Sequence, residues 1–396
     1  MTSRILVLTP RFPYPLYGGD LLRIYRLCES LQSDFRITLL SICQSDTEMR
    51  TQLPADSPFA EVHRVYMPRW HSYANALMAL VTGRSMQTAY YASTNFARAV
   101  ARLKGNNDIL LCHLARTAPY ARGFEGIKVL ELTDYIPLTY ARSNALKSKP
   151  LSLRRLIYTL EQNRLDRAQN QLAHQFDLIT FVSDVDRSMF LVSSGIPSEK
   201  VVTFGNGVNL QERPFRGDRS GRTLAFIGTL KAMPNADAVS YFITSVLPII
   251  HRSEPNVKFR VVGLVDAKFK ARFESRYVEF TGPVPDLASA VEDCVLGICP
   301  VRIGAGMQNK MLDYMALGLP AVTTRIGAEG LENHDGNTFT VADEPNELAA
   351  IIIKLLHDEP RRHQLAHAGR QLMEKQYSWA GRLADFSRHI IAARKR

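Results

Sequence analysis

The chain has 396 residues, of which 46% are hydrophobic and 22% charged, and its formal net charge at pH 7 is +11. This length indicates two domains, the composition is that of an ordinary globular protein, and no apolar run reaches the roughly 18 residues that a membrane-spanning helix needs. The sequence has no recognition helix, zinc-ligand spacing or aromatic RNA-binding motif, so nucleic acid is a weak interpretation of its basic charge.

The first half of the chain predicts strands alternating with helices. Buried strands are expected at Ile5–Thr9, Ile37–Ser41, Val62–Met67, Ile109–Cys112, Val129–Glu131 and Leu178–Val182. Helices are expected over Gly19–Leu31, Tyr73–Lys104 and Leu151–His174. Residues 1–220 hold 27 Lys/Arg against 19 Asp/Glu. This excess favours either an anionic membrane face or a simply solvated surface.

A second series of strands begins near Thr223. Its strands are expected at Leu224–Ile227, Lys258–Val262, Val278–Thr281, Gly297–Pro300, Ala321–Thr324 and Phe339–Val341, with helical stretches between them. Two such series predict an α/β protein with two doubly wound parallel sheets. The junction is expected near Phe204–Asn209, which predicts domains at residues 1–208 and 209–378.

Ligands of open α/β sheets bind beyond the carboxyl ends of the strands, and the first half marks three such places. Gly18 and Gly19 follow a proline-rich turn and begin a helix, where their amides are predicted to face a diphosphate. His113 and Arg116 follow another strand, and Asp134 follows a third. These positions predict contact with a sugar or an acid, with a structural role as the alternative for each.

The second half contains a stronger signal, a glycine-rich turn between a buried strand and a helix. Gly304 and Gly306 allow backbone amides to approach a phosphate, and Lys310 in the first turn of the helix supplies a positive charge. Asp313 lies one turn further on, where a carboxylate fits a ribose diol. Additional candidates for neutralising phosphate are Arg302, before the glycines, and Lys231, which follows Gly228 at another strand end.

Together these segments resemble a retaining nucleotide-sugar glycosyltransferase of the GT-B fold, family 4 type. The resemblance rests on the order and spacing of Gly18-Gly19, His113, Val182–Asp186, Asn206–Val208, Gly228, Gly282–Asp286, Gly304–Lys310, Gly318–Pro320 and Tyr377–Trp379. It implies two Rossmann-like domains facing each other across a cleft, with residues 379–396 forming a helix that crosses back to the first domain. The implied reaction is hexosyl transfer from a UDP- or GDP-sugar to a glycan or lipid-linked acceptor, in bacterial polysaccharide or glycoconjugate synthesis.

The resemblance also implies roles for individual residues. His113, Lys310, Arg302 and Lys231 are expected to be catalytic, the last three by stabilising the departing diphosphate. The donor is expected to contact Gly18, Gly19, Gly228, Val284, Gly304, Ala305, Gly306, Met307, Gln308, Asn309 and Asp313. The acceptor is expected at Arg116 and Asp134. No metal and no cofactor are expected, because the nucleotide-sugar is itself the substrate.

The chain departs from the family pattern at Ala305, where a glutamate near the transferred sugar is common; the paired carboxylate position holds Asp313. Two alternatives therefore stay open: a nucleotide-sugar 2-epimerase of the same fold, and a non-catalytic nucleotide-binding partner subunit. A dehydrogenase is disfavoured because Asn309 occupies the third glycine position of a dinucleotide fingerprint.

Five cysteines without a Cys-x-x-Cys pair predict reduced thiols and a cytoplasmic protein. The apolar segment Trp70–Val81 and the basic pair Arg154-Arg155 are predicted to lie against the inner face of a membrane.

Overall fold

The computed structural model describes residues 3–146, 153–332 and 336–393, with the side chains of 153–155 outside the description. The chain divides into two compact units: Met1–Gly205 with Leu383–Arg396, and Asn206–Arg382. These limits differ by three or four residues from the expected 1–208, 209–378 and 379–396. The difference has a local cause, because Val208 pairs with Ser378 in an isolated parallel bridge inside the second unit.

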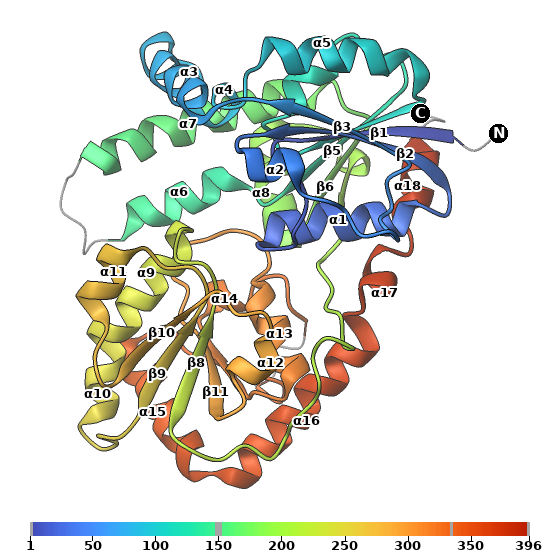
Figure 1. Cartoon of the computed structure of the whole chain (residues 1–396). Helices are drawn as coiled ribbons and strands as arrows, with labels where there is room; N and C mark the ends of the chain where they lie inside the picture. The colour runs from blue at the N-terminus through green and yellow to red at the C-terminus, as the bar shows by residue number, and fades with distance from the viewer. Residues whose placement is uncertain (1–2, 147–152, 333–335, 394–396) are drawn as a thin grey trace. The chain divides into compact units, whose positions relative to one another are not determined.

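The first unit is a seven-stranded parallel sheet of order β3-β2-β1-β4-β5-β6-β7, with helices on both faces (Figure 1). Its strands are β1 Ser3–Thr9, β2 Phe35–Cys43, β3 Glu61–Tyr66, β4 Ile109–His113, β5 Ile127–Thr133, β6 Leu178–Phe181 and β7 Val201–Thr203. Its helices are α1 Gly19–Leu31, α2 Asp46–Arg50, α3 Arg69–Thr82, α4 Met86–Ala89, α5 Thr94–Leu103, α6 Ile136–Ala145, α7 Leu153–Ala173, α8 Asp184–Ser194 and α18 Phe386–Ala393, with short 3-10 turns at Lys104–Asn106, Ala118–Ala121 and Ser198–Lys200.

The second unit is a six-stranded parallel sheet of order β10-β9-β8-β11-β12-β13. Its strands are β8 Thr223–Ile227, β9 Lys258–Val262, β10 Val278–Gly282, β11 Cys294–Cys299, β12 Ala321–Thr323 and β13 Thr340–Val341. Its helices are α9 Met233–Tyr241, which continues through a π-turn at Phe242–Val246 into α10 Leu247–His251, then α11 Ala267–Phe273, α12 Leu287–Ala290, α13 Asn309–Leu317, α14 Arg325–Ala328, α15 Pro345–His357 and α16 Glu359–Gln376. The short α17 Trp379–Leu383 follows.

The strand order of each sheet reverses once, and the candidate sites described below lie beside these two points of reversal. In the first unit β1 and β4 are neighbours, and the chain proceeds outward from them in opposite directions. In the second unit β8 and β11 have the same relation. Every residue of β4 and β11 is buried, as expected for central parallel strands covered on both faces. In open α/β sheets, ligands bind beside the loops that follow such strands.

The expected α/β class and the two parallel sheets are confirmed, while several elements differ in detail. The helical region expected over Tyr73–Lys104 is three helices, because Gly83 ends α3 in a left-handed conformation and Ser93 caps α5. The short edge strand β7 and helix α6 were not predicted. At the other end of the chain, α18 packs in the first unit, where Phe386 meets the ring of Phe204.

Candidate functional site

The site of the second unit begins where β11 ends. The chain passes through Gly304 and Gly306, whose φ angles of 154° and 72° suit glycine rather than side-chain-bearing residues, and enters α13 at Asn309. Among the described residues, no side chain caps this helix; the Met311 amide donates to the Gln308 carbonyl at 2.9 Å, and the positive end of the helix faces the glycine turn, where an anion is favoured. We call residues 302–310 the cradle.

Lys310 is the buried charge of the cradle. The residue is only 7% exposed. Its Nζ donates to Gln308 Oε1 at 2.8 Å and lies 5.4 Å from the centre of the Phe226 ring of β8. Within the described chain no carboxylate comes within ion-pair distance of this ammonium. Burial lowers the pKa of Lys310, and the nearby Cys299 and Asp313 only partly oppose that effect. A buried ammonium of this kind is suited to an anionic ligand.

Arg302 and Lys231 differ from Lys310 in their surroundings. The guanidinium of Arg302 is already engaged, with Nη2 at 3.0 Å from Asp237 Oδ2 and its centre 4.0 Å from the Tyr241 ring. It thereby ties the cradle to α9. Lys231 follows the end of β8 and is exposed. Just before it, Gly228 has a φ of 154°, and a Cβ there would lie 2.8 Å from the Asn235 side chain.

Asp313 and its neighbours are held by contacts that the sequence did not reveal. Arg213 Nε donates to Asp313 Oδ1 at 2.7 Å, and Asn206 Nδ2 donates to Asn309 Oδ1 at 2.7 Å. Both partners come from the segment before β8, which therefore braces the start of α13. The remaining expected donor contacts within the cradle, Ala305 and Met307, are buried, while Val284 is half-buried in the loop after β10.

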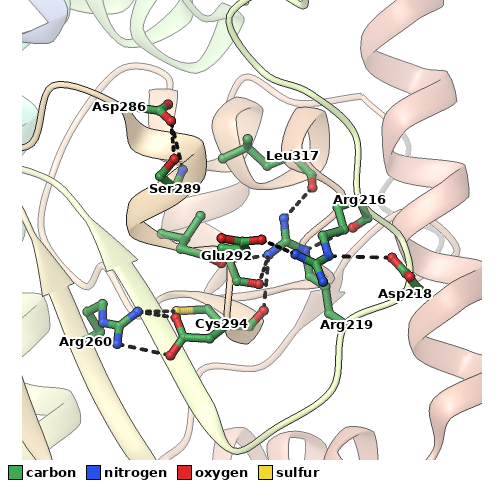
Figure 2. Close-up of polar contacts among 11 residues, drawn as sticks. Arg216, Asp218, Arg219, Arg260, Asp286, Ser289, Glu292, Cys294 and Leu317 are labelled. Atoms are coloured by element: carbon green, nitrogen blue, oxygen red, sulfur yellow. Dashed lines mark hydrogen bonds and ion pairs between the residues drawn. The ribbon is translucent and has the colours of Figure 1, made fainter.

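A pocket of about 420 Å³ elsewhere in the second unit is not a candidate for the nucleotide. It is lined by Arg216, Arg219 and Glu292 among others, beside the amino end of β11 rather than its carboxyl end. The Arg219 guanidinium donates to the carbonyls of Val291, Cys294 and Leu317, of which the last two are labelled in Figure 2. This arginine is buried and satisfies carbonyls at helix and strand ends, which is a structural role.

In the first unit, the loop after β1 leads into the amino end of α1. Gly18 has a φ of 119° and precedes the helix, and no side chain of the described residues caps it. Asp20 in the first turn pairs with Arg11 from the proline-rich loop. Burial would raise the pKa of Asp20, but the charges of Arg11, His113 and Arg116 lower it overall. These four residues therefore share one electrostatic environment at the carboxyl end of the sheet.

His113, the last residue of β4, is bonded to a buried glutamate. Its Nδ1 lies 2.7 Å from Glu131 Oε2, and Glu131 also accepts from Arg23 Nε at 3.3 Å and from the Thr133 hydroxyl. Burial would raise the pKa of Glu131, but the bonds to His113, the charge of Arg23 and the bond from Thr133 keep it below the usual value. The glutamate is thus ionised at neutral pH.

Two features mark this cluster as more than core packing. His113 Nε2 is buried and has no hydrogen-bond partner among the described residues, although buried polar atoms are ordinarily satisfied. Leu114 and Thr133, which follow β4 and end β5, have φ angles of 64° and 62°. Such angles strain residues that bear side chains, and Thr133 is β-branched. An unsatisfied imidazole between two strained strand ends is typical of a functional site.

Asp134 and Arg116 lie at the same edge of the sheet. Burial and the charges of Asp186, Glu131 and Asp20 raise the pKa of Asp134 well above its ordinary value. Arg116 Nε donates to Gln87 Oε1 at 3.1 Å, and the side chain also lines a groove of about 650 Å³ beneath α3. Arg116 therefore connects the strand-end cluster with this groove.

Sequence reasoning selected His113, Asp134 and Lys310 as candidates, but it did not select Glu131, Arg23 or Arg213, which contact the candidate residues in the structure. Glu131 had a signal, because a carboxylate inside the apolar run Val129–Leu132 must be paired if the strand is buried. Nothing in the sequence indicated that Arg23 or Arg213 would be the partners. Among the described residues, no three His, Cys, Asp or Glu side chains are grouped to hold a metal ion. None of the described helices has the length and apolar character needed to cross a bilayer.

Comparison with known families matches part of the second unit. Residues 221–358, from β8 through α15, match the family described as Glycosyl transferases group 1. A Klebsiella pneumoniae protein described as "Uncharacterized 44.6 kDa protein in cps region" is 21% identical over 213 residues, which are 50% of this chain and 52% of that protein. The matched part of the chain thus spans about half the length of this relative.

Solved structures match nearly the whole chain. Anabaena HepE, in complex with UDP and glucose, is 14% identical, with a TM-score of 0.70 and coverage of 98% of this chain and 100% of that one. Sucrose-phosphate synthase from Thermosynechococcus elongatus is 13% identical, with a TM-score of 0.72 and coverage of 99% and 100%. The two Rossmann-like units of this chain therefore have the fold of GT-B glycosyltransferase structures.

Proposed function

We propose that this protein is a glycosyltransferase that uses a nucleotide-sugar donor, and that it is a retaining, hexosyl-transferring enzyme of family 4. The observation that supports this most is the cradle, in which Lys310 is buried with no carboxylate partner among the residues that the structure describes, inside the segment that matches the glycosyltransferase family. A buried ammonium is costly unless an anion neutralises it. The diphosphate of a UDP- or GDP-sugar supplies that anion.

The donor is held mainly by the second unit in this proposal. The amides of Gly304, Gly306 and the first turn of α13 receive the diphosphate, and Asp313 accepts from the ribose hydroxyls with its carboxylate held by Arg213. As the bond from the sugar to the phosphate oxygen breaks, negative charge grows on the leaving diphosphate. Lys310 stabilises that charge, and the exposed Lys231 adds to it. Arg302, already paired with Asp237, positions the cradle.

His113 supports the reacting sugar in this proposal, and Glu131 is its positioning residue. The ionised Glu131 accepts a hydrogen bond from Nδ1 of His113 and so fixes the ring proton on that nitrogen. The other nitrogen, Nε2, is then free of a proton and contacts the sugar. The ionised Glu131 also favours, through His113, the positive charge that develops on the sugar ring during transfer. Arg116 and Asp134 are proposed to bind the acceptor, which is a glycan or a lipid-linked saccharide of bacterial polysaccharide or glycoconjugate synthesis.

The first experiment is a calorimetric titration of the full chain with UDP, GDP and ADP, for wild type and for Lys310→Met. We expect one nucleoside diphosphate to bind, and the variant to bind it at least tenfold more weakly. The matched control is Lys268→Met, which removes an exposed lysine of α11 and should leave the affinity unchanged. Binding of none of the three nucleotides would refute the proposal.

The second experiment distinguishes the alternatives that share a nucleotide site. The protein is incubated with the sugar of the nucleotide that binds, with and without saccharide acceptors, and the products are analysed by NMR. Transfer with retained anomeric configuration supports the proposal. An epimerised nucleotide-sugar identifies an epimerase, and tight nucleotide binding without turnover on any acceptor favours a non-catalytic subunit.

A further inference from the structure

Helix α3 has its large apolar residues on the side that faces solvent. Trp70, Tyr73, Leu77, Met78 and Val81 are between 61% and 81% exposed. The two buried residues of the helix are Ser72 and Ala79, which are small. A surface helix ordinarily does the reverse and turns its large apolar side chains to the core. The exposed residues at 70, 73, 77 and 81 are three or four apart and form one continuous stripe.

The exposure of this stripe is maintained by buried polar contacts beneath it. Glu161 of α7 is 2% exposed and accepts from the Ser85 hydroxyl at 2.7 Å and from the amides of Met86 and Gln87 at 2.9 and 3.0 Å. Arg164, one turn later on α7, donates to the Leu80 carbonyl at 3.3 Å. These bonds fix the end of α3 and the start of α4, so the helix is held with its apolar face outward.

The charges of the segment that contains α3 are of one sign. Residues 62–107 contain six Lys/Arg and no Asp/Glu. Arg69 at the start of α3 and Arg84 just after its end are both exposed. The stripe is therefore bordered by cations at both ends, and a negatively charged surface is complementary to it.

We propose that α3 docks this protein on an anionic lipid bilayer. Trp70, Tyr73, Leu77 and Val81 enter the boundary between headgroups and acyl chains, where aromatic rings are favoured, and Arg69 and Arg84 contact the lipid phosphates. A second copy of the chain fits less well, because a stable dimer needs roughly 20–30 residues on each side and α3 has only 14. The inference does not depend on the proposed glycosyl transfer. The Arg154-Arg155 pair, also expected at the membrane, lies outside the described side chains.

The test is co-sedimentation of the full chain with vesicles of phosphatidylcholine alone or with 30–40% phosphatidylglycerol (on the order of the anionic content that gives a strong surface potential). We expect binding to the anionic vesicles, weakened by high salt. The double variant Leu77→Ser/Val81→Ser should lower the partition coefficient about tenfold or more, from lost apolar burial. Val192→Ser is the control, since Val192 is 86% exposed on α8 of the same unit.

Arg69→Glu/Arg84→Glu provides an independent variant that leaves the apolar stripe intact. It should abolish the preference for anionic vesicles, while nucleotide binding and thermal unfolding stay as in wild type. The inference is overturned if wild type binds both vesicle types equally weakly, or if Val192→Ser weakens binding as much as the α3 variant. Concentration-dependent self-association that is lost in the α3 variant, without vesicle binding, would identify a second copy as the occupant instead.

Discussion

Lys310→Met should make the protein more stable and less active at the same time. The substitution removes a buried ammonium that donates a hydrogen bond to the neutral Gln308 side chain, and it keeps an unbranched side chain of similar length. Replacing a buried ion pair by apolar side chains of similar volume often stabilises a protein by about 1–4 kcal/mol. We therefore expect the free energy of unfolding in urea, without ligand, to rise by that amount at pH 7.

The loss of activity follows from the charge. A unit charge about 4 Å from a phosphate oxygen is worth on the order of 4 kcal/mol at an effective dielectric constant of about 20. Removal of one preorganised group that stabilises a developing anion costs about 100- to 1000-fold in turnover, which agrees with that magnitude. We expect kcat/KM for the donor to fall by this factor, measured by release of nucleoside diphosphate in saturating acceptor.

Proton linkage gives the same side chain a second signature. Burial lowers the pKa of Lys310 in the folded state, so between the lowered pKa and the ordinary lysine pKa the unfolded chain binds more protons than the folded chain. The free energy of unfolding without ligand should therefore rise with pH across this range. A bound diphosphate raises the pKa again, so binding in this pH range should take up a proton in wild type. Calorimetry in buffers of different ionisation enthalpy measures that uptake. Unchanged stability, turnover and proton uptake in Lys310→Met would refute the role of the ammonium.

Further predictions concern the first unit. Glu131→Gln should lower turnover at least tenfold with little change in nucleotide affinity, and it should shift the pH profile of kcat if it acts through His113; equal losses in both measurements would indicate a structural role only. Asp134→Asn should increase the free energy of unfolding at pH 7. The folded-state pKa of Asp134 is raised, so the wild-type protein becomes less stable as the pH rises from the ordinary carboxyl pKa to the raised one. Urea titrations between pH 4 and 8 should show that loss of stability in wild type and not in the variant. Glu161→Ala leaves two backbone amides of α4 without their acceptor and should cost about 2–4 kcal/mol in urea unfolding, whereas exposed Glu125→Ala should have almost no effect.

Much of the fold followed from local patterns. The apolar runs at Ile109–Cys112 and Gly297–Pro300 predicted central strands, because parallel strands covered on both faces need apolar residues at every position. Element ends were harder to predict. The split of residues 73–104 into three helices depended on Gly83 and Ser93, whose capping roles are visible only once the backbone is known.

The candidate residues were selected from the sequence, but their pairings were not. Glycine spacing and strand ends were enough to select His113, Gly304, Gly306 and Lys310, because the carboxyl edge of a parallel sheet is fixed by chain order. Hydrogen bonds and ion pairs between residues far apart in the sequence could not be predicted from glycine spacing or strand ends. Arg302 was expected to face phosphate, yet it lies against Asp237, 65 residues earlier in the chain.

The sequence alone thus determined two α/β units, their order and the loops that follow their central strands, since these depend on local periodicity and on glycine. Tertiary structure decided which charges are neutralised and which are left for a ligand. Glu131 is bonded to Arg23 of α1 and to His113 of β4, both more than a dozen residues away, while Lys310 is buried with no carboxylate within ion-pair distance among the described residues. It also decided that α3 turns its large apolar side chains outward. Burial and charge balance depend on contacts between distant segments, and those contacts exist only in the folded chain.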